Sequence, residues 1–117
     1  MSEFLLLYRR TPEIRLETMG SPEKAQQTMN KWRAWFEEMT RKGQLKSPGQ
    51  PLDDAGKVVS AKGRVTDGPY KEAKDVIGGY SIIEADDLSQ AAQIAAGCPL
   101  VEAGGSVEIR PAMRLNL

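Results

Sequence analysis

Two segments of the chain carry apolar side chains on both faces of a predicted strand. In "EFLLLYR", residues 3–9, Phe4, Leu6 and Tyr8 point one way and two leucines point the other, because strand side chains alternate. Residues 75–85, "DVIGGYSIIEA", divide their apolar side chains between two faces in the same manner. Both faces of both strands must therefore be covered, which rules out a sheet with one face in water.

Two helices are predicted to supply part of that cover. The first begins at "SPEK", where Ser21 suits the N-cap and Pro22 the first helical position, and Gly43 is a natural stop. Its apolar residues recur at steps of three and four, which indicates one buried stripe: Ala25, Met29, Trp32, Phe36 and Met39. The second lies in "DDLSQAAQIAAGCP", where Asp87 and Gln90 form a plausible capping box.

The remaining segments complete the order β-α-β-β-α-β. "KVVSAKGRVT", residues 57–66, is predicted to be a bent strand or a short hairpin, and "GSVEIRP", residues 105–111, the last strand. Residues 43–56 have three glycines, two prolines and no periodicity, so we expect an exposed, mobile loop. The fold class is α+β, ferredoxin-like, with an antiparallel sheet in a single domain, 1–117. Two helices cover only one face, so we expect a homodimer in which a second copy covers the other.

Charge and composition exclude several functions. The 16 basic and 16 acidic residues balance, so no global field recruits nucleic acid or an anionic membrane, and no apolar run approaches the roughly 20 residues of a membrane span. The chain has no histidine, hence no imidazole base, imidazole metal ligand or Ser-His pair. One cysteine, Cys98, excludes an internal disulfide and a cysteine-cluster zinc site. We expect a soluble cytoplasmic protein without built-in metal or cofactor.

A family resemblance rests on "VTDGPYKEAKDVIGGYSIIEADDLSQAAQIAAGCP" followed by "GGSVEIRP". These stretches closely resemble the YCII-related proteins, in the branch named for a DGPF motif, which here reads Asp67-Gly68-Pro69-Tyr70 with Tyr in place of Phe. The opening strand and the Gly/Pro-rich middle also fit, so the resemblance covers nearly the whole chain. It implies a ferredoxin-like domain that dimerises through its sheet into an α/β barrel.

The resemblance implies less about function. The wider superfamily is similar to muconolactone-isomerase-type enzymes, and some members have a His–Asp pair in the cleft, which a chain without histidine does not carry over. Members of the DGPF branch are often associated with sigma-factor-type transcription regulators, which suggests a regulatory partner.

Residues 66–80, "TDGPYKEAKDVIGGY", hold most of the candidate site residues. Asp67 before Gly68-Pro69 is also ordinary turn chemistry. Two adjacent glycines, Gly78 and Gly79, weaken a strand unless backbone or a ligand approaches closely. Glu72 and Lys74 are two apart, so in an extended segment both point the same way, at a cleft rim or into solvent.

Two functions stay open on these residues. The first is a cofactor-free lyase or isomerase acting on a small anionic metabolite, with Asp67 or Glu72 as base and Lys74 or Arg110 as electrostatic stabiliser. In this hypothesis Tyr8 or Tyr80 positions the substrate. The alternative is a non-catalytic small-molecule-binding or regulatory module.

Overall fold

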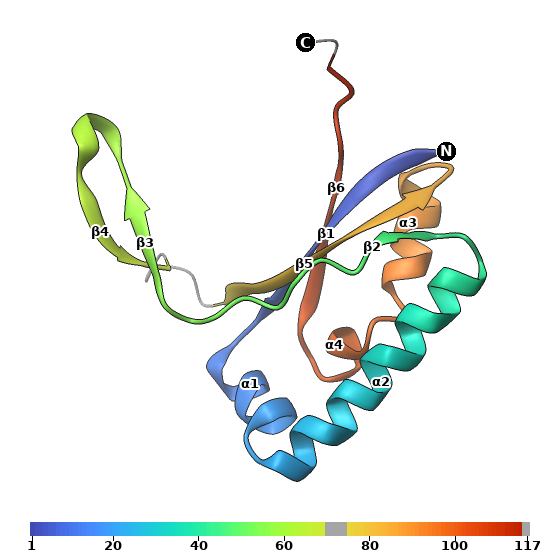
Figure 1. The fold of residues 1–117 in the computed structure, drawn as a ribbon, viewed down its shortest axis with the longest axis horizontal. Helices are drawn as coiled ribbons and strands as arrows, with labels where there is room; N and C mark the ends of the chain where they lie inside the picture. Colours follow the sequence, from blue (N-terminus) through green and yellow to red (C-terminus); the bar gives the residue numbers. More distant parts are fainter. Residues whose placement is uncertain (70–74, 116–117) are drawn as a thin grey trace.

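The computed structural model describes residues 1–69 and 75–115. Figure 1 shows a twisted sheet with the helices gathered on one side and a separate hairpin that projects from the other. The elements are β1 (Ser2–Arg10), α1 (Pro12–Met19), α2 (Pro22–Arg41), β2 (Leu45–Ser47), β3 (Gly56–Val59), the 3-10 turn η1 (Ala61–Gly63), β4 (Val65–Gly68), β5 (Val76–Ala85), α3 (Leu88–Ala95), α4 (Pro99–Glu102) and β6 (Ser106–Pro111).

The main sheet has the strand order β2-β5-β1-β6, and every neighbouring pair is antiparallel. In chain order the four strands of this sheet are β1, β2, β5 and β6. The first and third, β1 and β5, are hydrogen-bonded neighbours in the centre, and the second and fourth, β2 and β6, are the edges. This is the ferredoxin-like α+β arrangement, and the predicted fold class is confirmed.

The helix boundaries follow from capping chemistry. The Ser21 hydroxyl accepts the backbone N–H of Lys24 at 3.2 Å, and Gly43, just beyond the end of α2, has the positive φ of 70° that glycine tolerates best. Helix α1 was not predicted. Its Thr11 accepts the N–H of Ile14 at 3.2 Å, and Pro12 follows at the first helical position, so it begins with the same chemistry as α2.

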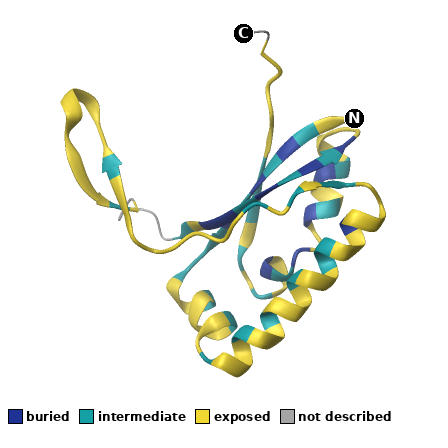
Figure 2. Cartoon of the chain, viewed as in Figure 1, coloured by how far each residue is buried: buried dark blue, intermediate teal, exposed yellow. Residues whose placement is uncertain are grey.

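The core lies between the sheet and helices α2, α3 and α4 (Figure 2). Phe4, Leu6 and Tyr8 of β1 are buried on this side of the sheet, and Ile83 of β5 and Met39 of α2 join them. The predicted α2 stripe does face this core, although Met29 at its edge stays exposed. Small residues of α3, Ala91 and Ala95, are fully buried and let that helix lie close to the strands.

The second strand of the sheet is not where the sequence predicted it. The edge strand is β2, within the segment 43–56 that was predicted to be a loop. The segment 57–66, predicted to be a bent strand or a short hairpin, is a hairpin, but it lies outside the main sheet. Residues 57–66 contain three valines, which favour a strand, whereas β2 is only three residues long and its sequence, Leu-Lys-Ser, gives no strand signal. Sheet pairing with β5 decides its conformation.

The other side of the sheet, which we term the open face, is covered by none of the helices in the described part of the chain (Figure 1). Its centre is apolar, because Leu5 lies opposite Ile82 and Leu7 opposite Tyr80 across the β1–β5 ladder. All four side chains are only partly buried. The two-faced apolar pattern of the sequence therefore corresponds to one packed face and one face without cover from the described residues.

Candidate functional site

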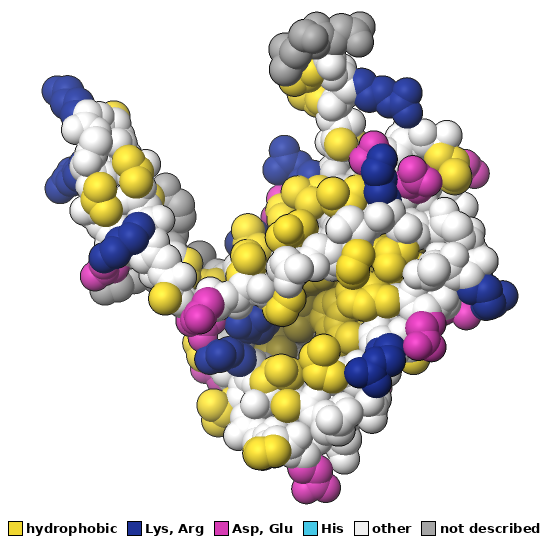
Figure 3. Space-filling model, in the orientation of Figure 1, with side chains coloured by type: hydrophobic (Ala, Val, Ile, Leu, Met, Phe, Trp, Pro, Cys, Tyr) yellow, Lys and Arg dark blue, Asp and Glu magenta, His cyan; other side chains and the backbone are white. Residues whose placement is uncertain are grey.

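A cavity of about 340 Å³ lies between helices α1 and α2, the 48–51 segment and the β1–β5 part of the sheet. Figure 3 shows a hollow lined with hydrophobic side chains between α2 and the sheet. The volume is at the lower end of the range that small-molecule sites span, about 300–1,000 Å³. The aromatic and hydroxyl-bearing residues of the lining are Tyr8, Thr18, Thr28, Trp32, Phe36 and Tyr80.

The aromatic wall of the cavity is built from α2 and β1. Trp32 meets the Tyr8 ring edge-on, with ring centroids 4.8 Å apart and planes at 84°. Trp32 also lies 5.7 Å from Phe36, one helical turn further along the same face. These rings offer a flat apolar surface to a molecule of similar shape.

Arg10, at the end of β1, brings a positive charge to this apolar cavity. Its side chain is only 18% exposed. The guanidinium donates to the carbonyl of Gly78 at 3.3 Å and to the Asp54 carboxylate at 3.1 Å. Asp54 also binds Arg15 of α1 at 2.6 Å, so one carboxylate serves two guanidinium groups and the cluster keeps one net positive charge. Such a cluster favours an anion in the cavity.

Glycine at position 78 makes room for Arg10. The β1–β5 ladder shifts register at this point: Tyr8 pairs with Gly79 and Arg9 with Ile77, which leaves Gly78 as the extra residue of a bulge. A Cβ at Gly78 would collide with the Arg10 guanidinium. At Gly79 a Cβ would lie 3.1 Å from the Gln50 carbonyl oxygen. The predicted close approach at this glycine pair is thus made by the chain's own arginine and the 48–51 segment.

The 48–52 segment forms one wall of the cavity and is tied to β5. The N–H of Tyr80 donates to the Gln50 carbonyl at 3.3 Å, and the N–H of Leu52 donates to the Gly78 carbonyl at 2.9 Å. Gly49 has φ 65° and packs directly on the Tyr80 backbone, where no side chain fits. The segment continues the edge that β2 begins.

A buried hydrogen-bond chain joins the core to this wall. The Tyr8 hydroxyl donates to Ser81 Oγ at 2.7 Å, and the Ser81 hydroxyl donates to the Pro48 carbonyl at 2.7 Å. Burial raises the pKa of Tyr8 well above its ordinary value, although the hydrogen bond to Ser81 acts in the opposite direction. Tyr8 therefore stays neutral and offers its oxygen as a hydrogen-bond acceptor, not as a base.

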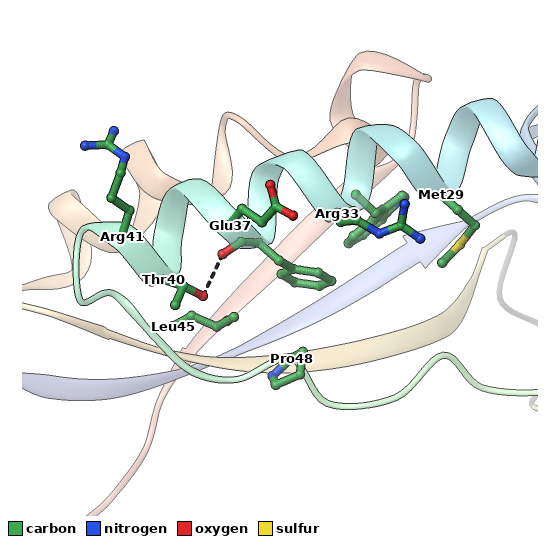
Figure 4. Close-up of a pocket in the computed structure, with 9 residues that line it drawn as sticks. Met29, Arg33, Glu37, Thr40, Arg41, Leu45 and Pro48 are labelled. Carbon is green, nitrogen blue, oxygen red and sulfur yellow. Dashed lines mark hydrogen bonds between the residues drawn. The ribbon is translucent and has the colours of Figure 1, made fainter.

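A second, more open groove of about 600 Å³ lies between α2 and the segment that contains β2 (Figure 4). Leu45 and Pro48 form its floor, and Arg33, Glu37 and Arg41 stand along the helix above them. These charged side chains are exposed. The groove shares the aromatic wall with the cavity but contains no buried charge, so we place the candidate site in the cavity.

The structure does not bring the predicted acidic residue Asp67 to the cavity. Asp67 lies on β4 of the projecting hairpin, is 76% exposed, and binds Lys57 of β3 at 2.6 Å. It is therefore part of a strand pair and not of the turn that the sequence predicted. Glu72 and Lys74 lie outside the described residues.

The other predicted site residues divide between the two faces of the sheet. Tyr8 and Tyr80 both line the cavity. Arg110 of β6 lies across from Leu5 on the open face, is 67% exposed, and pairs with Glu108 at 3.4 Å. The Tyr8 side chain faces the cavity from the packed side of the sheet, whereas the side chains of Tyr80, opposite Leu7, and of Arg110 belong to the open face.

Sequence reasoning missed Arg10, Trp32 and the 48–51 segment as parts of a site. Arg10 ends an apolar strand, and its antiparallel partner region contains the glycine pair, so strand pairing would have placed an arginine beside Gly78-Gly79. Trp32 was predicted as core, which it partly is. The sequence of the 48–51 segment has no hydrophobic periodicity from which its pairing with β5 could be predicted.

Within residues 1–69 and 75–115, no three acidic, cysteine or histidine side chains gather in a group that could hold a metal ion. The lone thiol, Cys98, is buried between α3 and α4, where desolvation raises its pKa to about 11. No helix in the described part of the chain is long and apolar enough to cross a membrane.

Comparison with known proteins defines the class. The YCII-related domain family model matches residues 3–116, and the chain belongs to this family. Assignment to its DGPF branch stays a prediction. No curated protein matches the chain significantly.

Among solved structures, the chain is similar to 5-chloro-2-hydroxyhydroquinone dehydrochlorinase (TftG) from Burkholderia phenoliruptrix AC1100, determined in complex with 2,5-dihydroxybenzoquinone. The two share 19% sequence identity over 97% of this chain and 93% of that chain, with a TM-score of 0.45.

Proposed function

We propose that the protein binds a small organic anion with a flat apolar body in the cavity between α2 and the sheet. The observation that carries this proposal is the largely buried Arg10 guanidinium in a lining that is otherwise mostly apolar and aromatic. Arg10 is the anchor for a carboxylate or an enolate oxygen, and Trp32 and Phe36 are the surface for the body of the molecule. Tyr8 contacts it from the packed face of the sheet.

The rim of the cavity adds one ion pair to this arrangement. Lys31 of α2 and Glu102 of α4 are 3.4 Å apart, and both side chains are mostly exposed. Their charges cancel, so Arg10 sets the sign of the site. An exposed pair of this kind contributes little to stability and opens at small cost when a ligand enters.

Binding is better supported than catalysis. A cofactor-free lyase or isomerase needs a base beside the ligand, and the residues predicted for that role were Asp67 and Glu72. Asp67 lies on the hairpin, and Glu72 is outside the described residues. Among the described residues that line the cavity, Glu102 is the one carboxylate, and Lys31 holds it. A non-catalytic binding module therefore comes first, and lyase or isomerase activity on Asp67 or Glu72 stays a prediction, as does a regulatory partner.

A titration followed by NMR tests the binding proposal. Small aromatic and aliphatic carboxylates are added to ¹⁵N-labelled protein, and their neutral amides serve as matched controls. We expect the carboxylates to shift the Trp32 indole N–H and the amides of Gly78 and Gly79. Shifts confined to residues outside the cavity, or equal shifts from carboxylates and amides, contradict the proposal. New ligand resonances that grow with time would show turnover.

We also propose that the protein forms a homodimer through its open face. The support is the apolar centre of that face, Leu5, Leu7, Tyr80 and Ile82, and the ring of paired charges around it. Because the charges of this ring are already paired within one chain, a second copy meets no unpaired charge around the apolar centre. Sedimentation velocity at micromolar concentration should give a dimer, and a monomer under all conditions contradicts this.

A further inference from the structure

The β3–β4 hairpin, residues 56–68, which we term the arm, stands apart from the rest of the chain (Figure 1). Its two strands pack chiefly against each other. Val59 and Val65 are direct partners in the ladder, so they share one face, and they are 69% and 57% exposed. Figure 3 shows hydrophobic side chains on the arm with Lys and Arg side chains around them.

Such an arm is not stable by itself. A two-stranded hairpin without a third strand or a helix to pack on is at best marginally stable in water. The arm has neither, and the Lys57–Asp67 pair on the valine face is an exposed ion pair that contributes little. A surface outside the described part of its own chain is therefore required to hold it.

The solvent-accessible area of the chain indicates how large an interface is available for this contact. A compact monomer of 12.9 kDa exposes about 6,300 Å², whereas this chain exposes 8345 Å². Its radius of gyration is 15.6 Å, against about 13 Å for a compact domain of this length. The excess of about 2,000 Å² is more than the roughly 800 Å² that each partner buries in a standard interface.

The distribution of unpaired charges indicates that the surface on which the arm docks belongs to a second copy of this chain. Lys62 and Arg64 at the tip of the arm make no ion pair among the described residues. The same holds for Glu84, which lies beside Glu3 at the far end of the open face, and for Asp86 just beyond it. One chain thus carries a positive arm and a negative strand end that cannot reach each other within it, whereas two copies related by a two-fold axis can pair both.

We propose that the arm docks on a second copy of this chain and clamps the homodimer, with the Val59–Val65 face as the apolar contact and the tip at the partner's Glu84 end. This inference rests on the proposed open-face dimer and adds a second, separate contact to it. It assigns the exposed valines and the surplus area to an interface.

The test compares the wild type with two variants by sedimentation equilibrium, over a range of concentrations and at two salt concentrations. Val59→Asp combined with Val65→Asp removes the apolar contact of the arm. Leu16→Asp combined with Val101→Asp places the same two charges on α1 and α4, where both side chains are exposed, and is the matched control. Circular dichroism and thermal unfolding establish that the core stays folded in each.

We expect the arm variant to weaken dimerisation about tenfold or more, the control to leave it within about twofold, and higher salt to weaken the wild-type dimer. A wild-type dimer that the arm variant does not weaken overturns the clamp and leaves the open-face dimer standing. A wild type that stays monomeric overturns both. If the arm variant weakens the dimer only as much as the control variant does, the proposed clamp is also wrong.

Discussion

Gly78 determines where the Arg10 guanidinium lies, because a Cβ there would occupy its place. In Gly78→Ala the flexible arginine moves away and the backbone stays, so we expect unfolding free energy to fall by about 1 kcal/mol or less. The affinity for carboxylates should fall by a much larger amount than the unfolding free energy does. Chemical denaturation and ligand titration of the same sample separate the two effects.

Gly49→Ala is the contrasting variant, because its Cβ would meet the Tyr80 backbone and not a flexible side chain. We expect a large loss of stability there. If Gly78→Ala destabilised the protein as much as Gly49→Ala and left binding intact, the role assigned to Gly78 would be wrong.

The buried thiol of Cys98 makes the stability of the fold depend on pH in the alkaline range. Burial raises the pKa of this thiol from 9.0 to about 11, so between these values the unfolded chain has lost a proton that the folded chain keeps. Raising the pH through this window therefore favours unfolding, and stability that is complete below pH 9 is lost toward pH 11, by an amount of order 2 kcal/mol. Tyr8, whose pKa burial also raises, acts in the same direction at higher pH.

Urea unfolding of the wild type and Cys98→Ala at pH 8 and pH 11 isolates the thiol, because Tyr8 is common to both proteins. The wild type should lose more stability than the variant over this interval. Equal losses would show that the thiol titrates normally in the folded protein.

At the scale of single residues, the sequence predicted a close approach at the glycine pair, because strand glycines leave a local signal; the roles of Tyr8 and Tyr80 in a site stay predictions. It did not predict Arg10 as a site residue. The role of that side chain depends on a bulge in the β1–β5 ladder and on Asp54, which is 44 positions away in the chain. Neither contact has a local pattern.

Among the elements, the segment 43–56 departs most from its prediction. Glycine and proline content predicted a mobile loop, but β2 and the following residues pair with β5. We expect the Leu52 amide, which donates to Gly78, to exchange with solvent much more slowly than the Ala55 amide, which donates to an exposed Asp53 side chain. Hydrogen exchange that is equally fast at both positions would restore the loop prediction.

The helices were predicted better than the edge strand for a physical reason. Caps and the 3.6-residue period are local, so Ser21 and Gly43 mark α2 correctly, and Asp87 caps α3 as predicted by accepting the Gln90 N–H at 2.8 Å. An edge strand of three residues is stabilised by its partner and not by its own sequence. Helix α1 was missed although Thr11-Pro12 has the same signature as Ser21-Pro22, because it buries no residue and shows no apolar stripe.

For the whole molecule, the apolar character of both faces of the central strands was the most informative signal. It predicted that both faces of the sheet need cover, and one packed face is observed; the ferredoxin-like order of elements followed from the succession of predicted strands and helices and is also observed. The same signal predicts the homodimer, which is a proposal. The cavity was not predictable, since it forms where α2, the 48–51 segment and the sheet meet, and its shape depends on packing between elements distant in sequence.

We propose that Arg10 makes the cavity selective for an anion. Calorimetric titration with benzoate and with its neutral analogue benzamide tests it in the wild type, in Arg10→Met and in the control Arg110→Met. The ratio of the two affinities is the readout, because any movement of the 48–54 segment in Arg10→Met affects both ligands. A charge-assisted hydrogen bond of about 1.5–3 kcal/mol predicts a preference for benzoate of tenfold or more in the wild type and in Arg110→Met. We expect Arg10→Met to lose this preference for benzoate over benzamide. A wild type that binds both compounds equally, or an Arg10→Met variant that still prefers benzoate, would contradict it.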